Sequence, residues 1–195
     1  MIRSFRCNET ERLFNRLLSR RWRNIERVIR RKLELLNAAT SLMDLTVSHN
    51  NRLEALKGNR RGQHSMRVND QWRVCFVWRD GERTRSKWLT TTEVAMKKLT
   101  PIHPGEILST EFLAPKGLSQ SRLARAIRVP PRRINEICLG KRGVTPDTAL
   151  RLGRYFGVAA EFWMNLQQRY DLEVRRDQIA AELKRHIRPH SGRAA

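Results

Sequence analysis

Two short apolar patterns on either side of a tight turn, within residues 118–138, constrain this chain more than any other feature. Their inward positions are Leu123, Ala124 and Ile127, then Ile134, Ile137 and Cys138. Ser119 is a good N-cap for the first helix, and Pro130-Pro131 suits the entry to the second, since a proline there loses no hydrogen bond. The pattern predicts a helix-turn-helix unit.

The turn itself contains one unusual residue. Arg128 stands where such turns usually carry a glycine. A side chain held at positive φ costs on the order of 1 kcal/mol, because its Cβ crowds the backbone. We therefore expect a strained turn if the usual geometry is kept.

The second helix would turn a polar face outward, toward the major groove in proteins that read DNA with this unit. Arginine can pair with guanine, asparagine with adenine, and glutamate can accept from cytosine. The candidate DNA-contacting residues are Ser119, Gln120, Pro131, Arg132, Arg133, Asn135, Glu136, Lys141 and Arg142. The alternative is a helical pair packed for stability, with charges that are only solvated.

Four motifs extend this interpretation over most of the second half. They are His103-Pro-Gly-Glu-Ile-Leu108, Pro130-Pro-Arg-Arg-Ile-Asn-Glu-Ile137, Asp147-Thr-Ala-Leu-Arg-Leu152 and Phe162-Trp-Met-Asn-Leu166. Through them, residues 96–188 resemble a HigA-type antitoxin of the Xre-like repressor class. The resemblance implies operator DNA as a partner and a homodimer formed through the C-terminal region. The apolar residues of that region could instead cap the core of their own chain.

The charge balance points to polyanionic partners. The 195 residues include 40 Lys plus Arg against 19 Asp plus Glu, a formal net charge of +21, and the excess is spread over both halves. Such a chain attracts nucleic acid with a steep salt dependence.

Three cysteines without metal-ligand spacing predict no disulfide framework, metal site or cofactor, and a reducing, cytoplasmic location. No apolar run has the length of a membrane span, and we expect no membrane partner.

The first half carries the patterns of a small α+β unit. Ile2–Arg6 alternates like an edge strand, and apolar residues at helical spacing predict two helices within residues 9–39. Two strand-like runs, Ser65–Val68 and Trp72–Trp78, flank the turn signal Asn69-Asp-Gln. They predict an antiparallel hairpin.

Basic residues gather around this hairpin: Lys57, Arg60, Arg61, Arg67 and Arg73, with His64 close by. Cations on a concave sheet could grip an RNA backbone and stabilise the charge that develops at a scissile phosphate without a metal. Structural alternatives also exist. Lys57, Arg60 and Arg61 could form a solvated turn, His64 could be an ordinary strand histidine, and Arg73 could be an ion-pair partner.

Further motifs give this half a family resemblance. They are Ile2-Arg-Ser-Phe-Arg6, Leu56-Lys-Gly58, Gly62-Gln63, Arg67-Val-Asn69 and Trp72-Arg-Val-Cys-Phe-Val-Trp78. Through them, residues 1–82 resemble a HigB toxin of the RelE-like ribonuclease superfamily. The resemblance implies cleavage of messenger RNA on the ribosome, with Lys57, Arg67 and Arg73 as the basic residues of the catalytic site. It also implies a terminal Asp-Tyr-His segment that supplies proton transfer and base stacking.

That terminal segment is absent, and residues 82–96 stand in its place. One permitted codon choice for these residues, read from its third base, encodes Thr-His-Glu-Val-Glu-Met-Val-Asp-Tyr-His followed by a stop. We therefore hypothesise that adjacent toxin and antitoxin genes were joined by a frameshift, with Met96 as the original antitoxin start. A DNA sequence of codons 79–96 that cannot encode this ending would refute the hypothesis. Loss of the segment predicts weak or absent catalysis.

The expected fold is an α+β domain followed by an all-α helix-turn-helix domain, with the two halves in contact. The expected layout is a toxin-like domain over residues 1–89, a linker over 90–103, an antitoxin-like domain over 104–188 and a tail over 189–195. Two functions follow: a DNA-binding autorepressor with an attached, catalytically impaired toxin domain, or an active messenger-RNA endoribonuclease inhibited in cis by its antitoxin. Nucleic-acid binding without specificity is disfavoured by the ordered motifs.

Overall fold

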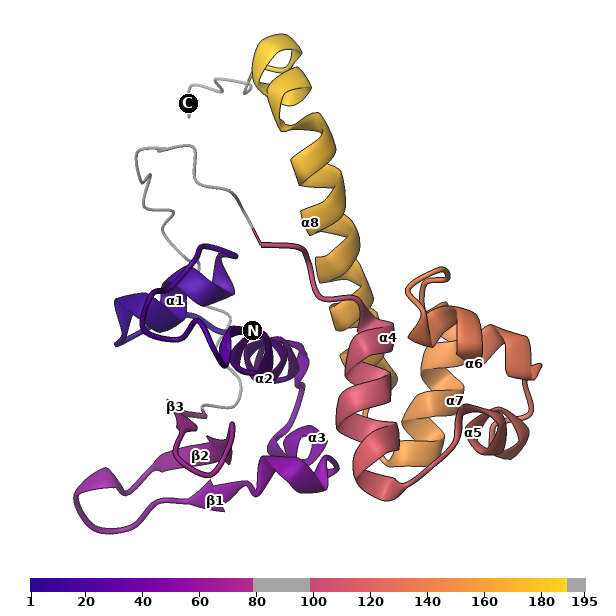
Figure 1. Cartoon of the computed structure of the whole chain (residues 1–195), viewed down its shortest axis with the longest axis horizontal. Helices are drawn as coiled ribbons and strands as arrows, with labels where there is room; N and C mark the ends of the chain where they lie inside the picture. The colour runs from indigo at the N-terminus through magenta and orange to yellow at the C-terminus, as the bar shows by residue number, and fades with distance from the viewer. Residues whose placement is uncertain (79–98, 189–195) are drawn as a thin grey trace, which may run out of the picture.

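The computed structural model describes residues 1–78 and 99–188, called below the N-terminal and C-terminal halves (Figure 1). In the N-terminal half, α1 covers Asn8–Phe14, α2 Glu26–Ala38 and α3 Leu42–Thr46. The two helices expected within residues 9–39 are confirmed. Residues 15–25 separate them, and there Arg16 takes a positive φ of 64°.

Three short antiparallel strands complete this half: β1 Glu54–Ala55, β2 Gln63–Arg67 and β3 Arg73–Val77, in the order β1-β2-β3. The hairpin expected from the sequence is β2–β3. Its turn is closed by Asn69, whose Oδ1 accepts from the backbone N–H groups of Gln71 and Trp72 at 3.1 and 2.8 Å. β1 is only two residues long, too short to carry an alternation that would predict it.

The edge strand expected over Ile2–Arg6 is wrong, because this segment pairs with no strand of the part that the structure describes. Its backbone is held by a side chain instead: the Ile2 N–H donates to Oδ1 of Asn37 on α2 at 3.0 Å. Ile2 and Phe5 still pack beside Leu13 in a small apolar cluster. The alternation of apolar residues predicts which side of a segment is buried, but it does not show whether another strand lies beside it.

The C-terminal half is helical, and its caps follow the sequence signals. Its elements are α4 Pro104–Ile107, a π-helical segment Leu108–Leu113, a 3₁₀ turn Ala114–Lys116, α5 Gln120–Ala126, α6 Pro131–Cys138, α7 Pro146–Phe156 and α8 Ala160–His186. Ser119 and Thr145 cap α5 and α7, each accepting from the backbone N–H three residues further on. Gly157 ends α7 with φ 73°. The all-α domain and the two helices expected for the helix-turn-helix, here α5 and α6, are therefore confirmed.

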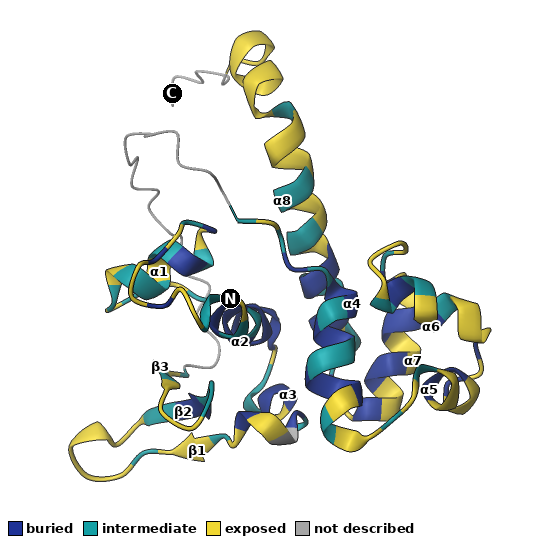
Figure 2. Cartoon of the chain, viewed as in Figure 1, coloured by how far each residue is buried: buried dark blue, intermediate teal, exposed yellow. Residues whose placement is uncertain are grey.

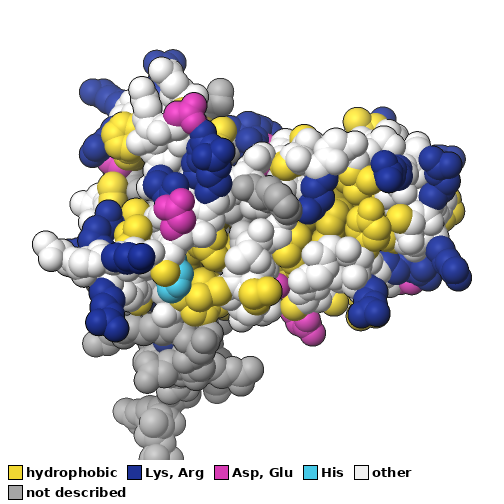
Figure 3. Space-filling model, turned by 90° about the horizontal axis from the view of Figure 1, so that it is seen from below, with side chains coloured by type: hydrophobic (Ala, Val, Ile, Leu, Met, Phe, Trp, Pro, Cys, Tyr) yellow, Lys and Arg dark blue, Asp and Glu magenta, His cyan; other side chains and the backbone are white. Residues whose placement is uncertain are grey.

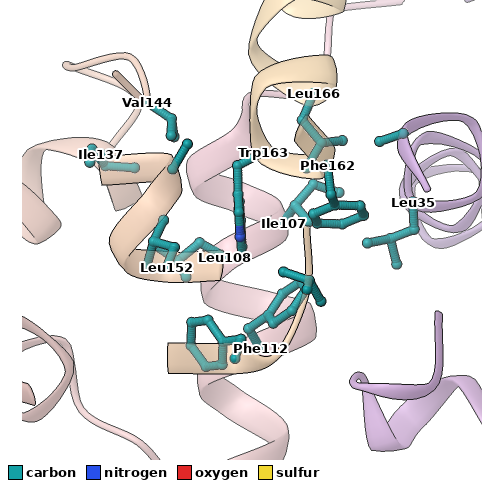
Figure 4. Close-up of a cluster of buried hydrophobic side chains, with 14 of the residues drawn as sticks. Leu35, Ile107, Leu108, Phe112, Ile137, Val144, Leu152, Phe162, Trp163 and Leu166 are labelled. Atoms are coloured by element: carbon teal, nitrogen blue, oxygen red, sulfur yellow. The ribbon is translucent and has the colours of Figure 1, made fainter. Parts of the chain in front are cut away.

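One apolar core joins the two halves. Leu35 and Leu36 of α2 belong to the same buried cluster as Ile107, Phe112, Phe162 and Trp163. In Figure 4, Leu35 faces Phe162 across the contact between the halves. The ring centroids of Phe112 and Trp163 lie 4.8 Å apart at the centre. The halves therefore share buried surface, as the sequence led us to expect.

Charged side chains cross the same contact. Lys32 on α2, with 3% of its side chain exposed, donates to Glu111 on the π-helical segment at 2.5 Å and to Asn51 at 2.7 Å. Glu34, also on α2, pairs with Arg169 of α8 at 2.7 Å. Burial raises the pKa of Glu34 to about 7 in spite of that arginine. Helix α2 is thus held on one side by the π-helical segment and on another by α8.

The end of the expected linker packs against the N-terminal half. The Leu99 N–H donates to the carbonyl of Arg16 at 2.8 Å, and the Thr100 carbonyl accepts from the Arg30 guanidinium at 2.7 Å. Ile102 is buried in the common core. The expected boundary at residue 89 and the replaced segment at 82–96 lie outside the described residues, and the domain limits stay a prediction.

Helix α8 continues well beyond the core. Figure 2 shows its distal part largely exposed. Two apolar side chains there, Leu172 and Leu183, are 53% and 39% exposed, and Ile187, directly after the end of α8, is 64% exposed. Within residues 1–78 and 99–188, no helix combines the length and apolar character needed to cross a membrane.

Candidate nucleic-acid interface

The helix-turn-helix buries the apolar side chains on its inner side. Four of its predicted inward residues are fully buried: Leu123, Ala124, Ile134 and Ile137. Two backbone hydrogen bonds set the turn, from the Arg128 N–H to the Arg125 carbonyl at 3.2 Å and from the Val129 N–H to the Ala124 carbonyl at 2.9 Å. Arg128 has φ 55°, so the strained geometry expected at this turn is confirmed.

Helix α6 is fixed at its C-terminal end by α4. A Cβ on Gly105 would lie 1.7 Å from the carbonyl oxygen of Ile137, so the two backbones touch and only glycine fits. His103 caps α4, because its Nδ1 accepts from the Gly105 N–H at 2.9 Å. Burial lowers the pKa of His103, which favours the neutral ring that can accept this bond. The outward face of α6 therefore stands on a tightly packed support.

The outward face of α6 carries the residues that the sequence assigned to DNA. The Arg132 side chain is 87% exposed, and that of Arg133 is 32% exposed. Asn135 is exposed and donates through Nδ2 to Oε1 of Gln120 on α5 at 3.0 Å. Polar groups of both helices thus meet on one surface, which is the arrangement expected of a base-reading face.

The other candidates flank this face. Ser119 uses its hydroxyl to cap α5, where it accepts from the Arg122 N–H at 3.2 Å. Pro131 is exposed at the first position of α6. Lys141 and Arg142 are exposed in the loop that follows α6. Each candidate therefore lies on α5, α6 or the loop beside them.

Two carboxylates hold arginines on this surface. Glu136 accepts from Nε of Arg132 at 2.6 Å and from Nε of Arg142 at 2.7 Å, one arginine on each oxygen. These two bonds lower the pKa of Glu136. Asp147 on α7 does the same for Arg133 at 2.7 Å and Arg151 at 2.9 Å, and its pKa is also lowered. Asp147 and Arg151 were not among the sequence candidates, although their spacing of four residues on one helix was a visible signal.

On the sheet, Arg67 of β2 and Arg73 of β3 lie opposite each other in the expected hairpin. Both already have acidic neighbours. Arg73 contacts Glu54 Oε2 at 3.0 Å and Ser65 Oγ at 2.9 Å. Arg67 pairs with Asp70. No sequence pattern predicted these acidic partners, since Glu54 comes from another strand and Asp70 from the turn.

The remaining basic candidates are distributed around the hairpin. Lys57 is exposed at the start of the 3₁₀ turn Gly58–Arg60, and Arg60 donates to Gln63 at 3.1 Å. His64 stacks against Phe76 on the face opposite Arg73, with ring centroids 5.8 Å apart. The structure therefore brings Arg67 and Arg73 together but separates His64 from them. No metal-binding group of His, Cys, Asp and Glu occurs among the residues described.

Basic side chains are not confined to one surface. Figure 3 shows Lys and Arg spread over the face seen from below, with apolar and uncharged atoms between them. This distribution agrees with the positive excess in both halves of the sequence. General attraction to polyanions is therefore expected beside any specific contact.

Two family models match the chain. Residues 3–86 match the RelE-like toxin of the type II toxin-antitoxin system HigB, and residues 111–163 match a helix-turn-helix family. Virulence-associated protein I of Dichelobacter nodosus is 56% identical over 77 residues, which are 40% of this chain and 71% of that protein. Toxin HigB-1 of Vibrio cholerae is 48% identical over 58 residues, 30% of this chain and 61% of the toxin.

Antitoxin HigA-1 of Vibrio cholerae is 35% identical over 88 residues, 45% of this chain and 82% of the antitoxin. Among solved structures, the Pseudomonas aeruginosa antitoxin HigA with higBA promoter is 44% identical with a TM-score of 0.46, covering 46% of this chain and 98% of that chain. The fold, the two family models and the similar relatives define a toxin–antitoxin protein with a helix-turn-helix. The chain belongs to the HigA antitoxin family and joins that antitoxin to a HigB-like toxin domain.

Proposed function

We propose that this chain is a sequence-specific DNA-binding autorepressor, an antitoxin that carries a catalytically impaired toxin domain in the same polypeptide. The outward face of α6 carries the proposal. A helix with a buried inner side presents Arg132, Arg133 and Asn135 on an exposed surface supported by α4. Guanidinium and amide groups recognise guanine and adenine edges in the major groove. The proposed partner is operator DNA near the protein's own gene.

Two features of the toxin half support impaired catalysis. The Asp-Tyr-His ending that the family resemblance implies is missing from the sequence. Arg67 and Arg73 each contact a carboxylate of the same half, so part of the positive charge that a scissile phosphate would meet is already neutralised. Lys57 stays exposed. We therefore assign Lys57, Arg67 and Arg73 to residual RNA phosphate contacts.

Binding to DNA from upstream of the protein's own gene tests the repressor function. We expect the unchanged protein to prefer this DNA over a scrambled duplex in anisotropy titrations at physiological salt. Charge alone gives non-specific dissociation constants of about 10⁻⁴–10⁻⁶ M. Arg132→Ala/Arg133→Ala should weaken operator binding at least about tenfold, because each arginine–guanine pair contributes about 1–3 kcal/mol.

The matched control is Arg20→Ala/Arg23→Ala, which removes the same charge from exposed positions between α1 and α2. It should lower affinity for both duplexes alike. Equal binding of the unchanged protein to operator and scrambled DNA would contradict the proposed function.

We also infer a homodimer that uses the distal part of α8. Leu172, Leu183 and Ile187 form more exposed apolar surface than a terminal helix needs. A second copy covering them would give the paired α6 helices that two half-sites require. Leu172→Lys/Leu183→Lys should yield monomers in light scattering where the unchanged chain is dimeric. Equal masses for the two proteins would overturn the inference.

A second candidate is an active ribosome-dependent messenger-RNA endoribonuclease inhibited in cis by the antitoxin half. One observation favours it: β3 stays accessible, with Arg73 and Cys75 exposed and Val77 56% exposed. Incubation with translating ribosomes and messenger RNA distinguishes the two candidates. The test uses the full chain and a Glu106→Ala/Arg169→Ala variant, which loses ion pairs between the halves and should relieve inhibition in cis. Cleavage by either protein that is lost when Arg73→Ala is added would establish the enzyme. Intact RNA with both proteins would support the impaired toxin domain.

A further inference from the structure

We propose that Glu136 is a positioning residue that holds Arg132 and Arg142 for DNA, and that it does not read a base itself. The inference rests on the proposed operator binding. The sequence alone allowed Glu136 to accept from cytosine. The structure points to a different role, because the carboxylate is already engaged from both sides.

Glu136 and the two arginines that it holds, Arg132 and Arg142, are called the Glu136 clamp below. Oε1 accepts from Arg132 Nε at 2.6 Å, and Oε2 accepts from Arg142 Nε at 2.7 Å. Arg132 lies one helical turn before Glu136, whereas Arg142 comes from the loop after α6. Only 18% of the Glu136 side chain is exposed, against 87% and 49% for the two arginines. Each oxygen thus already accepts a charged donor, and a cytosine amino group would have to compete with both arginines for a carboxylate of which little is exposed.

The Glu136 clamp leaves the terminal NH₂ groups of Arg132 and Arg142 available to bind DNA. Each arginine gives its Nε–H to Glu136, so its two terminal NH₂ groups remain. Within residues 1–78 and 99–188, no side chain or carbonyl hydrogen-bonds to the terminal NH₂ groups of Arg132 or Arg142. A guanidinium presents two parallel N–H bonds at that end, which match guanine O6 and N7 or two phosphate oxygens. The Glu136 clamp therefore leaves the paired NH₂ groups of each guanidinium free to meet DNA.

Electrostatics supports a positioning role over a direct contact with DNA. A carboxylate beside the phosphate backbone opposes binding, since it removes part of the positive charge that releases counterions. An arginine side chain also loses much rotamer freedom when DNA fixes it. Glu136 lowers that loss because it restrains two arginines before DNA arrives. The expected result is lower general affinity and higher discrimination between sequences.

The Asp147 contacts repeat the arrangement on the neighbouring helix. Asp147 holds Arg133 through one oxygen and Arg151 through the other. Arg151 is further fixed by the Ile127 carbonyl at 3.0 Å. Arginines at two consecutive positions of α6 are therefore each tied to a carboxylate. The contacts of Glu136 are the better ones to test, because the side chain of Arg132 is more exposed than that of Arg133.

Two conservative variants of the full chain separate the possible roles of Glu136. Glu136→Gln removes the charge, and Glu136→Asp keeps it but is too short to reach both Nε atoms. Both should lower the ratio of operator to scrambled-DNA affinity about tenfold, the discrimination expected of one arginine–guanine pair. Glu136→Gln should leave scrambled-DNA affinity unchanged or higher. Glu11→Gln, the same charge change at an exposed position of α1, is the control and should preserve the ratio.

The Arg132→Ala/Arg142→Ala background distinguishes positioning from base reading. There Glu136→Gln should change the ratio less than about twofold, because the residues it holds are gone. A full loss in that background would mean that Glu136 contacts a base, and it would overturn the inference. An unchanged ratio in both single variants would overturn it as well. If the unchanged protein shows no preference for operator, the proposed function itself fails.

A measurement without DNA keeps the two proposals apart. In ¹⁵N spectra of the free protein, the Nε–H protons of Arg132 and Arg142 should exchange with water more slowly than that of exposed Arg23. The difference should disappear in Glu136→Gln. Equal exchange for all three arginines in the unchanged chain would refute the clamp whatever the DNA titrations give.

Discussion

Arg128 holds the turn between α5 and α6 in the left-handed region, with φ 55°. An L-residue crowds its Cβ against the backbone there, whereas glycine does not. The turn is kept by the hydrogen bond from the Val129 N–H to the Ala124 carbonyl and by the buried contacts of both helices. The local cost is thus offset by packing on either side of the turn.

Arg128→Gly should raise the free energy of unfolding by about 0.5–1 kcal/mol, since relief of the strained φ outweighs the extra freedom of glycine in the unfolded chain. Arg125→Gly, at an exposed position inside α5, is the matched control and should lower it by about 1 kcal/mol. Urea unfolding followed by circular dichroism measures both. Equal destabilisation by the two glycines would mean that the turn is unstrained.

At the residue scale, the sequence predicted which side chains could touch nucleic acid but not their partners. The role of Ser119 as a cap and the burial of Ile134 were readable because they depend on neighbours within a few positions. The pairs of Arg133 with Asp147 and of Arg73 with Glu54 depend on how separate elements meet. A linear pattern carries no distance between such residues.

At the scale of elements, capped helices and the β2–β3 hairpin were predictable, because caps and tight turns are local chemistry. Three features were not. β1 forms by pairing with the edge of β2. The backbone of Ile2–Arg6 is hydrogen-bonded to a side chain and not to a strand. Leu108–Leu113 forms a π-helix. The π-helical segment carries Glu111, whose contacts lie in the other half of the chain.

The contact between α4 and α6 gives an element-scale prediction. Gly105→Ala should lower the free energy of unfolding by about 2 kcal/mol, because the new Cβ would overlap the Ile137 carbonyl. Alanine favours helix more than glycine, so helix propensity alone predicts the opposite sign. Thermal unfolding measures the change, with Arg154→Ala at an exposed position of α7 as the control. A variant as stable as the unchanged chain would show that the two backbones can separate freely.

At the scale of the whole molecule, the toxin and antitoxin halves share one core and a set of buried ion pairs. The sequence predicted two domains and their contact, since each half has its own patterns. It could not predict the surfaces used, because Lys32 and Glu111 are separated by 79 positions. Replacing one member of such a buried pair strands the other charge away from water.

Lys32→Met should therefore lower the free energy of unfolding by about 3 kcal/mol, because Glu111 stays buried without its closest cation. Lys32→Met/Glu111→Leu should recover most of this loss, since neither charge remains. Denaturant unfolding of the full chain measures both variants. A double variant less stable than Lys32→Met would indicate that Glu111 is held mainly by Arg31, which lies 3.3 Å away.

Hydroxyl-radical footprinting of the DNA upstream of the protein's own gene tests operator recognition most directly. A dimer that reads half-sites with α6 should protect two tracts about one helical turn, roughly 10 base pairs, apart. Both should disappear with Arg132→Ala/Arg133→Ala at protein concentrations where Arg20→Ala/Arg23→Ala retains them. Uniform protection along this DNA, matched on a scrambled duplex, would contradict sequence-specific repression.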